Sequence, residues 1–186
     1  MSRAGSRPSN HVEPRGPREI ARHYIRELIY GANDGIITTF AVVAGVAGGG
    51  LSPQVVLICG IANLLADGLS MAVGNYLAIR SYESVREAQG LPEEEASPIR
   101  HGLATFCAFV LVGALPLVPY VASLPGSRFA WSIGFAYSAM FAVGASRASI
   151  SNSRWWTAGL EMLGLGIVVT AVAYGAGALV ASLLGR

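Results

Sequence analysis

The chain has 186 residues, of which 53% are hydrophobic and 13% are charged, and its mean hydropathy is +0.50. Soluble domains carry about 25% charged residues, so this composition excludes an ordinary soluble domain. The net charge of +2 carries little information. The surroundings that the composition indicates are a lipid bilayer, and no nucleic-acid partner is expected.

Five apolar windows are each long enough to cross the ~30 Å hydrocarbon core as a helix, which takes about 20 residues. Because lipid offers the backbone no hydrogen bonds, a helix is the open structure that spans it. The sequence therefore predicts an all-α membrane protein with five transmembrane helices. Prolines interrupt the helical pattern between the third and fourth windows. The windows lie within residues 28–50, 54–79, 101–124, 129–147 and 157–183.

Three segments are expected along the chain. Residues 1–17 are rich in Pro, Arg and Ser and are predicted to form a disordered arm. Residues 18–28 place apolar and charged side chains on opposite sides, which predicts an interfacial amphipathic helix running into the first span. Residues 29–186 are expected to form a five-helix transmembrane domain. No secretory signal peptide is recognisable, so the first span is expected to act as an uncleaved anchor.

The basic residues set the expected orientation. All of them are arginines, and eleven fall before the first span or in the loops on that same side, whereas only Arg128 and Arg186 fall on the other. Positive charge favours the cytoplasmic side. We therefore expect an integral multi-pass protein with its N-terminus in the cytoplasm and its C-terminus outside.

Three acidic residues lie within these apolar windows: Asp34, Asp67 and Glu161. An ionised side chain at bilayer depth costs roughly 2.5–3.5 kcal/mol on insertion scales. Carboxylates kept there at that cost usually mark an ion path. The sequence therefore predicts a route for ions through the membrane.

Polar residues form a stripe on each of the first two spans. His23, Glu27, Gly31, Asp34 and Thr38 share a face of the first, and Asn63, Asp67, Met71 and Asn75 share a face of the second. The spans run in opposite directions, so Asp34 and Met71 are expected at one depth. Carboxylate, thioether and amide oxygen together suit a divalent metal softer than Mg²⁺, such as Fe²⁺ or Mn²⁺. The candidate metal ligands are Asp34, Met71, Asp67, Asn63, Glu27 and Glu161.

Structural alternatives exist for several of these residues. Asn63 and Asn75 suit hydrogen bonds between helices, and Met71 suits core packing. Glu161 is near the cytoplasmic end of its span, where it can reach the interface or pair with Arg154.

Other polar residues are predicted to have no role in metal binding. The acids at 93–95 are predicted to be a solvated patch, and His23 and His101 to be interfacial residues without a metal. Cys59 and Cys107 fall inside spans and are expected to pack rather than to form a disulfide.

Three stretches of the sequence resemble segments of a known family, and the first two are the more specific. ANDGIITTFAVVAGVAGG at 32–49 and GIANLLADGLSMAVGNYLA at 60–78 resemble the vacuolar iron transporter family, and GLEMLGLGIVVTAVAYGAG at 159–177 resembles the last helix of its short bacterial members. The resemblance implies a homodimer that exports Fe²⁺ or Mn²⁺ in exchange for protons. It also implies a pore between the first two spans of both subunits, contacted by Asp34 and Met71, and a bacterial cytoplasmic membrane.

The chain departs from that family in two respects. Plant members carry a Glu where this chain has Asn63, and they lack a carboxylate at Asp67. Plant and yeast-type members also insert a large Glu- and Met-rich metal-binding domain after the second span, where this chain has only residues 80–100. That segment is expected to stay helical through Glu87 and to break at Gly90.

The sequence thus predicts a secondary transporter and not an enzyme, with protons, lipid and the metal substrate as partners and with no cofactor. A channel or uniporter on the same path, an intramembrane aspartyl protease using the two Asp residues, and a non-transporting scaffold are the alternatives. Gly31 and Gly35 form a small-xxx-small pair. It predicts a homodimer seam at the first span, or instead close packing against another helix of the same subunit.

Overall fold

The computed structural model describes residues 8–11, 14–122, 124–149 and 154–185. Within these ranges the chain forms helices, together with one isolated bridge between Ser9 and Glu93. Five helical segments are long and apolar enough to cross a membrane, which confirms the predicted class and the number of spans. The elements are α1 (Pro17–His23), α2 (Ile25–Gly48), α3 (Pro53–Ala88), α4 (Pro98–Gly113), η1 (Leu115–Leu117), α5 (Val118–Val121), α6 (Arg128–Ser146), η2 (Arg147–Ser149) and α7 (Trp155–Leu183).

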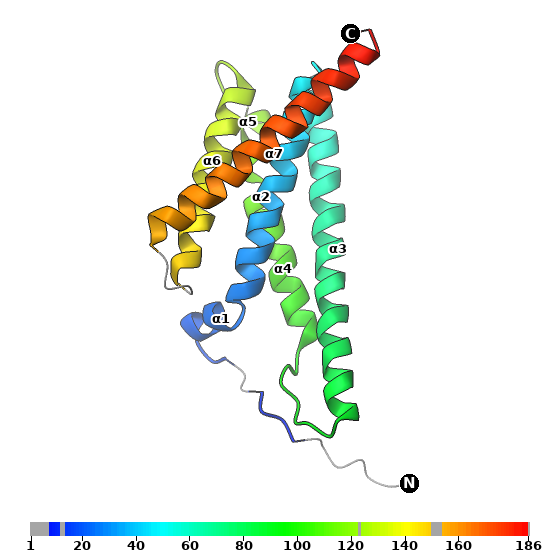
Figure 1. Cartoon of the computed structure of the whole chain (residues 1–186), viewed down its shortest axis with the longest axis vertical. Helices are drawn as coiled ribbons and strands as arrows, with labels where there is room; N and C mark the ends of the chain where they lie inside the picture. The colour runs from blue at the N-terminus through cyan, green and yellow to red at the C-terminus, as the bar shows by residue number, and fades with distance from the viewer. Residues whose placement is uncertain (1–7, 12–13, 123, 150–153, 186) are drawn as a thin grey trace.

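Helix α2 is the centre of the bundle. It packs against α3, α4, α6 and α7, and Figure 1 shows the other long helices arranged around it. Its apolar side chains pair with those of α4, α6 and α7 in one hydrophobic cluster. The fully or almost fully buried members of that cluster include Ile36, Phe40, Val43, Phe109, Met140 and Met162.

The first helix differs from the expected amphipathic segment. The backbone leaves helical geometry at Tyr24, so α1 ends at His23 and residues 25–28 already belong to α2. Tyr24 is buried, and its ring lies 4.7 Å from the ring of His23 and 4.8 Å from that of His101. These ring contacts hold the break, so α1 lies at the end of the bundle and does not extend α2 (Figure 1).

The third span is built from three short pieces. Helix α4 ends at Gly113, and η1 and α5 complete the segment to Val121. Pro116 and Pro119 stand at the start of η1 and α5, where a missing N–H costs nothing. The two prolines thus interrupt the third span near its end.

Gly31 and Gly35 belong to a seam within the subunit. A Cβ built on Gly35 meets the backbone of Phe109, and one on Gly31 meets the carbonyl oxygen of Thr105. The small residues therefore let α2 approach α4 closely. This finding favours the second interpretation of the glycine pair, close packing against another helix of the same subunit.

Helix α3 extends beyond the length of a membrane span. Its 36 residues measure about 54 Å. It ends at Ala88, and the chain turns at Gly90, whose φ of +71° suits glycine. The prediction of a helix through Glu87 and a break at Gly90 is confirmed.

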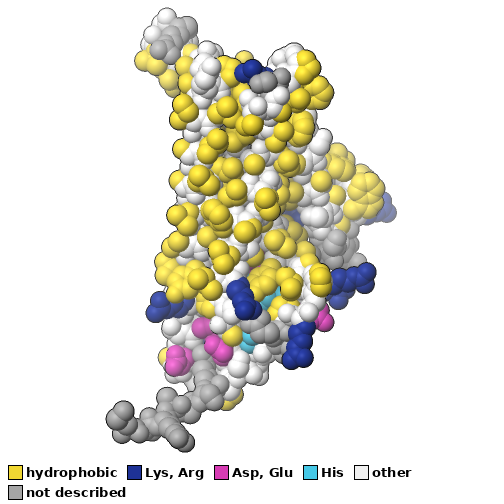
Figure 2. Space-filling view, turned by 180° about the vertical axis from the view of Figure 1, so that it is seen from behind, with side chains coloured by type: hydrophobic (Ala, Val, Ile, Leu, Met, Phe, Trp, Pro, Cys, Tyr) yellow, Lys and Arg dark blue, Asp and Glu magenta, His cyan; other side chains and the backbone are white. Residues whose placement is uncertain are grey.

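Charged side chains gather at the end of the molecule that carries the N-terminus. In Figure 2 the charged groups and histidines lie mainly below a band that is almost entirely hydrophobic. Such a band suits the lipid interior, which supports a multi-pass membrane protein. The assignment of the charged end to the cytoplasm stays a prediction.

Candidate metal path and N-terminal-end cluster

Asp34 lies on the central helix α2. Its neighbour Gly35 faces α4, so Asp34 is directed to another side of α2, where it is half-buried. Its backbone carbonyl accepts a hydrogen bond from Thr38 Oγ1 at 2.8 Å. Among the residues that the structure describes, none donates to its carboxylate or forms an ion pair with it. A charged group in this position is open to an ion.

Contacts with Phe109 of α4 show which residues of the two polar stripes lie at the same level along the bundle. Gly35 on α2 and Gly68 on α3 both face this residue. Asp67, next to Gly68, is therefore close to the level of Asp34. Half-buried carboxylates from α2 and α3 thus lie at similar levels within two helices that are long and apolar enough to span a membrane.

Met71 lies one turn from Asp67 on the same face of α3. One turn further on, Asn75 Nδ2 donates to Thr105 Oγ1 at 3.0 Å, and Thr105 also faces Gly31. These contacts place Asp34 at a level between Asp67 and Met71. The expected proximity in depth of Asp34 and Met71 is consistent with this geometry, although Met71 is also partly buried against the hydrophobic cluster.

The two asparagines behave differently. The Asn75 amide joins α3 to α4, as the structural alternative predicted. The Nδ2 of Asn63 is buried and has no hydrogen-bond partner within the described part of the chain. Asn63 is thus the polar group of α3 that the packing leaves available near Asp67, one turn away.

Glu27 is engaged in an ion-pair network and lies apart from the two aspartates. Its side chain is 2% exposed, and its Oε1 lies 2.8 Å from Arg26 Nη2 and 3.3 Å from His101 Nδ1. It precedes Asp34 by seven residues, or about 10 Å along α2. Glu27 therefore occupies the N-terminal end of the path and not its middle.

Glu161 is not brought to the other candidates. Its side chain is 63% exposed and lies 3.9 Å from Arg147 Nη1, at the end of α6. The ion-pair partner that the structure shows is thus Arg147, whereas the structural alternative named Arg154. The position suits an interfacial acid, and no described contact joins it to Asp34 or Asp67.

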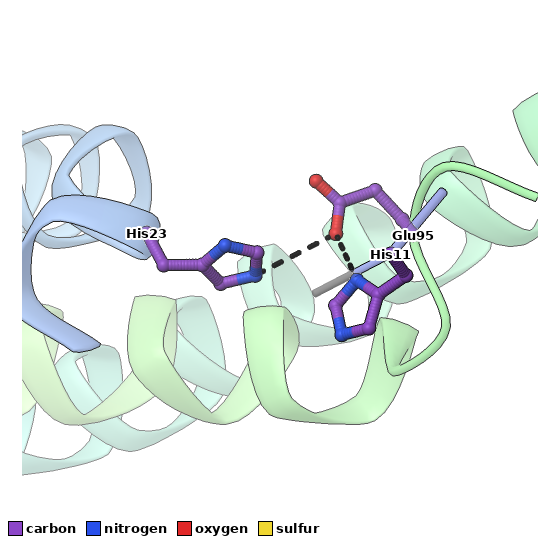
Figure 3. A group of neighbouring side chains, drawn as sticks. All are labelled: His11, His23 and Glu95. Carbon is purple, nitrogen blue, oxygen red and sulfur yellow. Dashed lines mark ion pairs between the residues drawn. The ribbon is translucent and has the colours of Figure 1, made fainter. Parts of the chain in front are cut away.

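A histidine cluster at the N-terminal end was missed by the sequence reasoning. His101 is 2% exposed and bridges Glu27 and Glu95, whereas an interfacial position was expected. His11 and His23 approach the same Glu95 oxygen (Figure 3). One signal was present, because Glu27 and His101 both stand at the start of spans that run in the same direction.

A model of the VIT family matches residues 25–91 and 83–178. The chain belongs to the VIT family. The match takes in α2 to α7, including both aspartates and Met71. The recognition made from residues 32–49 and 60–78 is thus confirmed.

Several relatives of this VIT-family chain carry the name vacuolar iron transporter. This chain is 42% identical to a vacuolar iron transporter of Toxoplasma gondii over 71 residues. It is 35% identical to vacuolar iron transporter 1 of Arabidopsis thaliana over 95 residues. These matches cover 38% and 46% of the chain, but only 24% and 38% of those proteins. Vacuolar iron transporter homolog 1 of rice (Oryza sativa) is 28% identical over 180 residues, covering 86% of the chain and 75% of the relative.

Proposed function

We propose that this VIT-family protein carries Fe²⁺ or Mn²⁺ across a membrane, out of the cytoplasm, in exchange for protons. The observation that carries the proposal is the pair Asp34 and Asp67, two half-buried carboxylates at similar levels on adjacent spans, for which the described part of the chain shows no ion pair with a cation. The names of the relatives support iron as a substrate.

Coupling to protons follows from the chemistry of such a pair. Two like charges held close together in a poorly solvated place repel each other, and either a proton or a metal ion relieves that repulsion. A carboxylate must lose its proton before it binds a metal. Protons entering from one side thus displace metal toward that side, and a proton gradient drives the exchange.

The donor set suits a transition metal. Asp34 and Asp67 supply hard oxygens, Met71 supplies a thioether, and Asn63 supplies an amide oxygen within one turn of Asp67. Sulfur favours Fe²⁺ over Ca²⁺ or Mg²⁺, and the carboxylates accept Mn²⁺. Glu27 is expected to act at the entrance, because it lies about two turns closer to the N-terminal end.

A parallel homodimer and a bacterial cytoplasmic membrane complete the proposal. The glycine pair is already in contact with α4, so the dimer contact that we propose uses other residues. Helix α3 offers an exposed apolar row, which includes Leu65, Leu69 and Val73. Single cysteines along this row are expected to crosslink two copies in the membrane, and transport without any such crosslink, there or along α2, contradicts a shared pore.

Flux into proteoliposomes tests the central claim. Asp34→Ala is expected to abolish Fe²⁺ and Mn²⁺ flux without loss of insertion, because removing a charge at bilayer depth favours insertion. Asp67→Asn is expected to lower flux and flatten its pH dependence. Glu87→Gln, an exposed acid at the far end of α3, is the matched control.

Three outcomes distinguish the alternatives. Near-normal flux in inserted Asp34→Ala shows that Asp34 is structural and refutes the proposal. Flux that ignores the pH gradient in the wild-type protein indicates a uniporter or channel. No flux of either metal under any gradient favours a scaffold.

A further inference from the structure

We propose that His11, His23 and Glu95 form a second binding site for a divalent transition-metal ion, outside the membrane path and at the end of the molecule that carries the N-terminus. The site does not depend on the proposed transport activity, because metal binding there is measurable in a protein that moves nothing. Its donor set is two imidazoles and one carboxylate.

The three side chains converge on one point. Glu95 Oε2 lies 3.8 Å from His11 Nδ1 and 3.7 Å from His23 Nε2, and one ligand atom from each residue lies within 4.8 Å of the others. Figure 3 shows the two rings directed at the carboxylate from different segments. Ligand atoms about 2.1 Å from an ion lie about 3.0–3.4 Å apart. Small rotations of the three side chains therefore suffice to close them around a metal.

The fold brings His11 to this point through backbone hydrogen bonds. The amide of Glu93 donates to the carbonyl of Pro8, and the amide of Asn10 donates to the carbonyl of Glu93, both at 2.8 Å. The N-terminal arm, expected to be disordered, is thus joined at residues 8–11 to the loop between α3 and α4. For residues 1–7 and 12–13 the predicted disorder falls outside the described residues. Residues 14–17 are described and lead into α1, which begins at Pro17.

The loop that carries Glu95 is fixed from α3. Glu83 is buried, and its Oε1 accepts the backbone N–H groups of Glu94 and Glu95 at 3.1 and 3.0 Å. Arg86 donates to the carbonyl of Pro92 at 2.8 Å. The acids at 93–95 are therefore not simply a solvated patch, because Glu95 is held in one place and only 27% of its side chain is exposed.

His101 stands behind the site and orients its carboxylate. His101 Nε2 lies 2.9 Å from Glu95 Oε2, while His101 Nδ1 lies 3.3 Å from Glu27 on α2. Groups bonded to a metal ligand fix its orientation and tune its affinity. The row Glu95, His101 and Glu27 also connects the site with the start of the helix that bears Asp34.

The chemistry selects the class of ion. Two imidazoles and a carboxylate leave coordination positions open for water and suit Fe²⁺, with Mn²⁺ and Co²⁺ as close analogues. The His11 and His23 side chains are 5% and 22% exposed, so the rings are shielded while the carboxylate remains reachable. In a metal transporter such a site captures the ion beside the entrance to the membrane path.

Mn²⁺ alone is the probe for the test. The chain contains only three histidines, so full-length protein purified with a histidine-free tag gives few possible sources of imidazole nitrogen. Electron spin echo measurements on bound Mn²⁺ are expected to show ¹⁴N couplings in the wild-type protein. The couplings are expected to disappear in the double variant His11→Ala/His23→Ala, and the Kd for Mn²⁺ is expected to rise at least about tenfold in His23→Ala and in Glu95→Gln.

Matched variants separate the site from the membrane path. Glu93→Gln, in the same loop, is expected to keep the couplings and the Kd, and Asp34→Ala is expected to keep the couplings while losing flux. The proposal is overturned if Mn²⁺ bound to the wild-type protein shows no ¹⁴N coupling, or if the couplings and the Kd survive in folded His11→Ala/His23→Ala. In the latter case the histidines serve only as ion-pair partners of Glu95. If Asp34→Ala loses flux and bound Mn²⁺ shows no ¹⁴N couplings, only the proposed histidine site is refuted. If Asp34→Ala keeps both the ¹⁴N couplings and normal flux, only the proposed membrane path is refuted.

Discussion

The close approach of α2 and α4 gives a sharp prediction, because a single methyl group tests it. In Gly35→Ala the new Cβ meets the carbonyl oxygen, Cα and carbonyl carbon of Phe109. All three are backbone atoms, so no side-chain rotation makes room. The two helices must separate, and Asp34, the next residue, must move with α2.

The expected magnitude is the difference between two effects. Replacing Gly by Ala within a helix stabilises by roughly 0.5–1 kcal/mol. Forcing an extra carbon into a well-packed contact costs typically 1–3 kcal/mol. Gly74→Ala on α3 gains the first term without the second, since nothing lies within 4 Å of its built Cβ. The free energy of unfolding of Gly35→Ala should therefore fall below that of Gly74→Ala by about 1–3 kcal/mol.

Thermal unfolding in detergent, followed by circular dichroism, measures this difference. For a chain of this size it corresponds to a Tm lower by about 2–12 °C in Gly35→Ala than in Gly74→Ala. Equal Tm values refute the α2–α4 seam. Loss of crosslinking between copies at unchanged Tm would restore Gly35 to a homodimer contact.

Three further changes have distinct outcomes. Met71→Leu keeps the volume and removes the thioether, so Fe²⁺ and Co²⁺ flux should fall more than Mn²⁺ flux; equal losses mean that Met71 only packs. Glu27→Ala leaves His101 and Arg26 without their shared carboxylate and should lower the free energy of unfolding by on the order of 3 kcal/mol. Glu27→Gln should lower it by less. Identical chemical denaturation curves for wild type and Glu27→Ala contradict this network. Glu83→Ala releases the loop between α3 and α4, so hydrogen exchange at the amides of Glu94 and Glu95 should accelerate. Glu87→Ala should leave this exchange unchanged. Equal exchange rates in both variants show that Glu83 does not hold the loop.

Hydropathy and helical period predicted most of the fold. The predicted first span at 28–50 became Ile25–Gly48, and the last at 157–183 became Trp155–Leu183. Long apolar windows have few alternatives in lipid, so their number and approximate ends follow from composition. The break near Pro116 was also visible, since proline cannot donate to the helix ladder.

Tertiary contacts between distant segments were beyond the reach of period and hydropathy. The face of α2 that Gly35 occupies was readable, but whether another copy or α4 covers it was not. The histidine cluster unites positions 11, 23, 95 and 101, which share no helical repeat. It depends on a backbone bridge between Ser9 and Glu93, and backbone pairing of this kind leaves no pattern in the side chains.

The interruption of the third span also changes which helices the span contacts. Helix α4 packs against α2 and α3, whereas η1 and α5 add contacts with α6 and together keep contacts with α2 and α3. The carbonyl of Pro116, which the break frees, accepts a hydrogen bond from the buried hydroxyl of Ser132 on α6 at 2.7 Å. The Pro116 carbonyl is therefore paired at the bend and not exposed to lipid. A single span thus packs along α2 and α3 through α4 and reaches α6 near its end, so residues 114–117 join α6 to the α2–α4 part of the bundle.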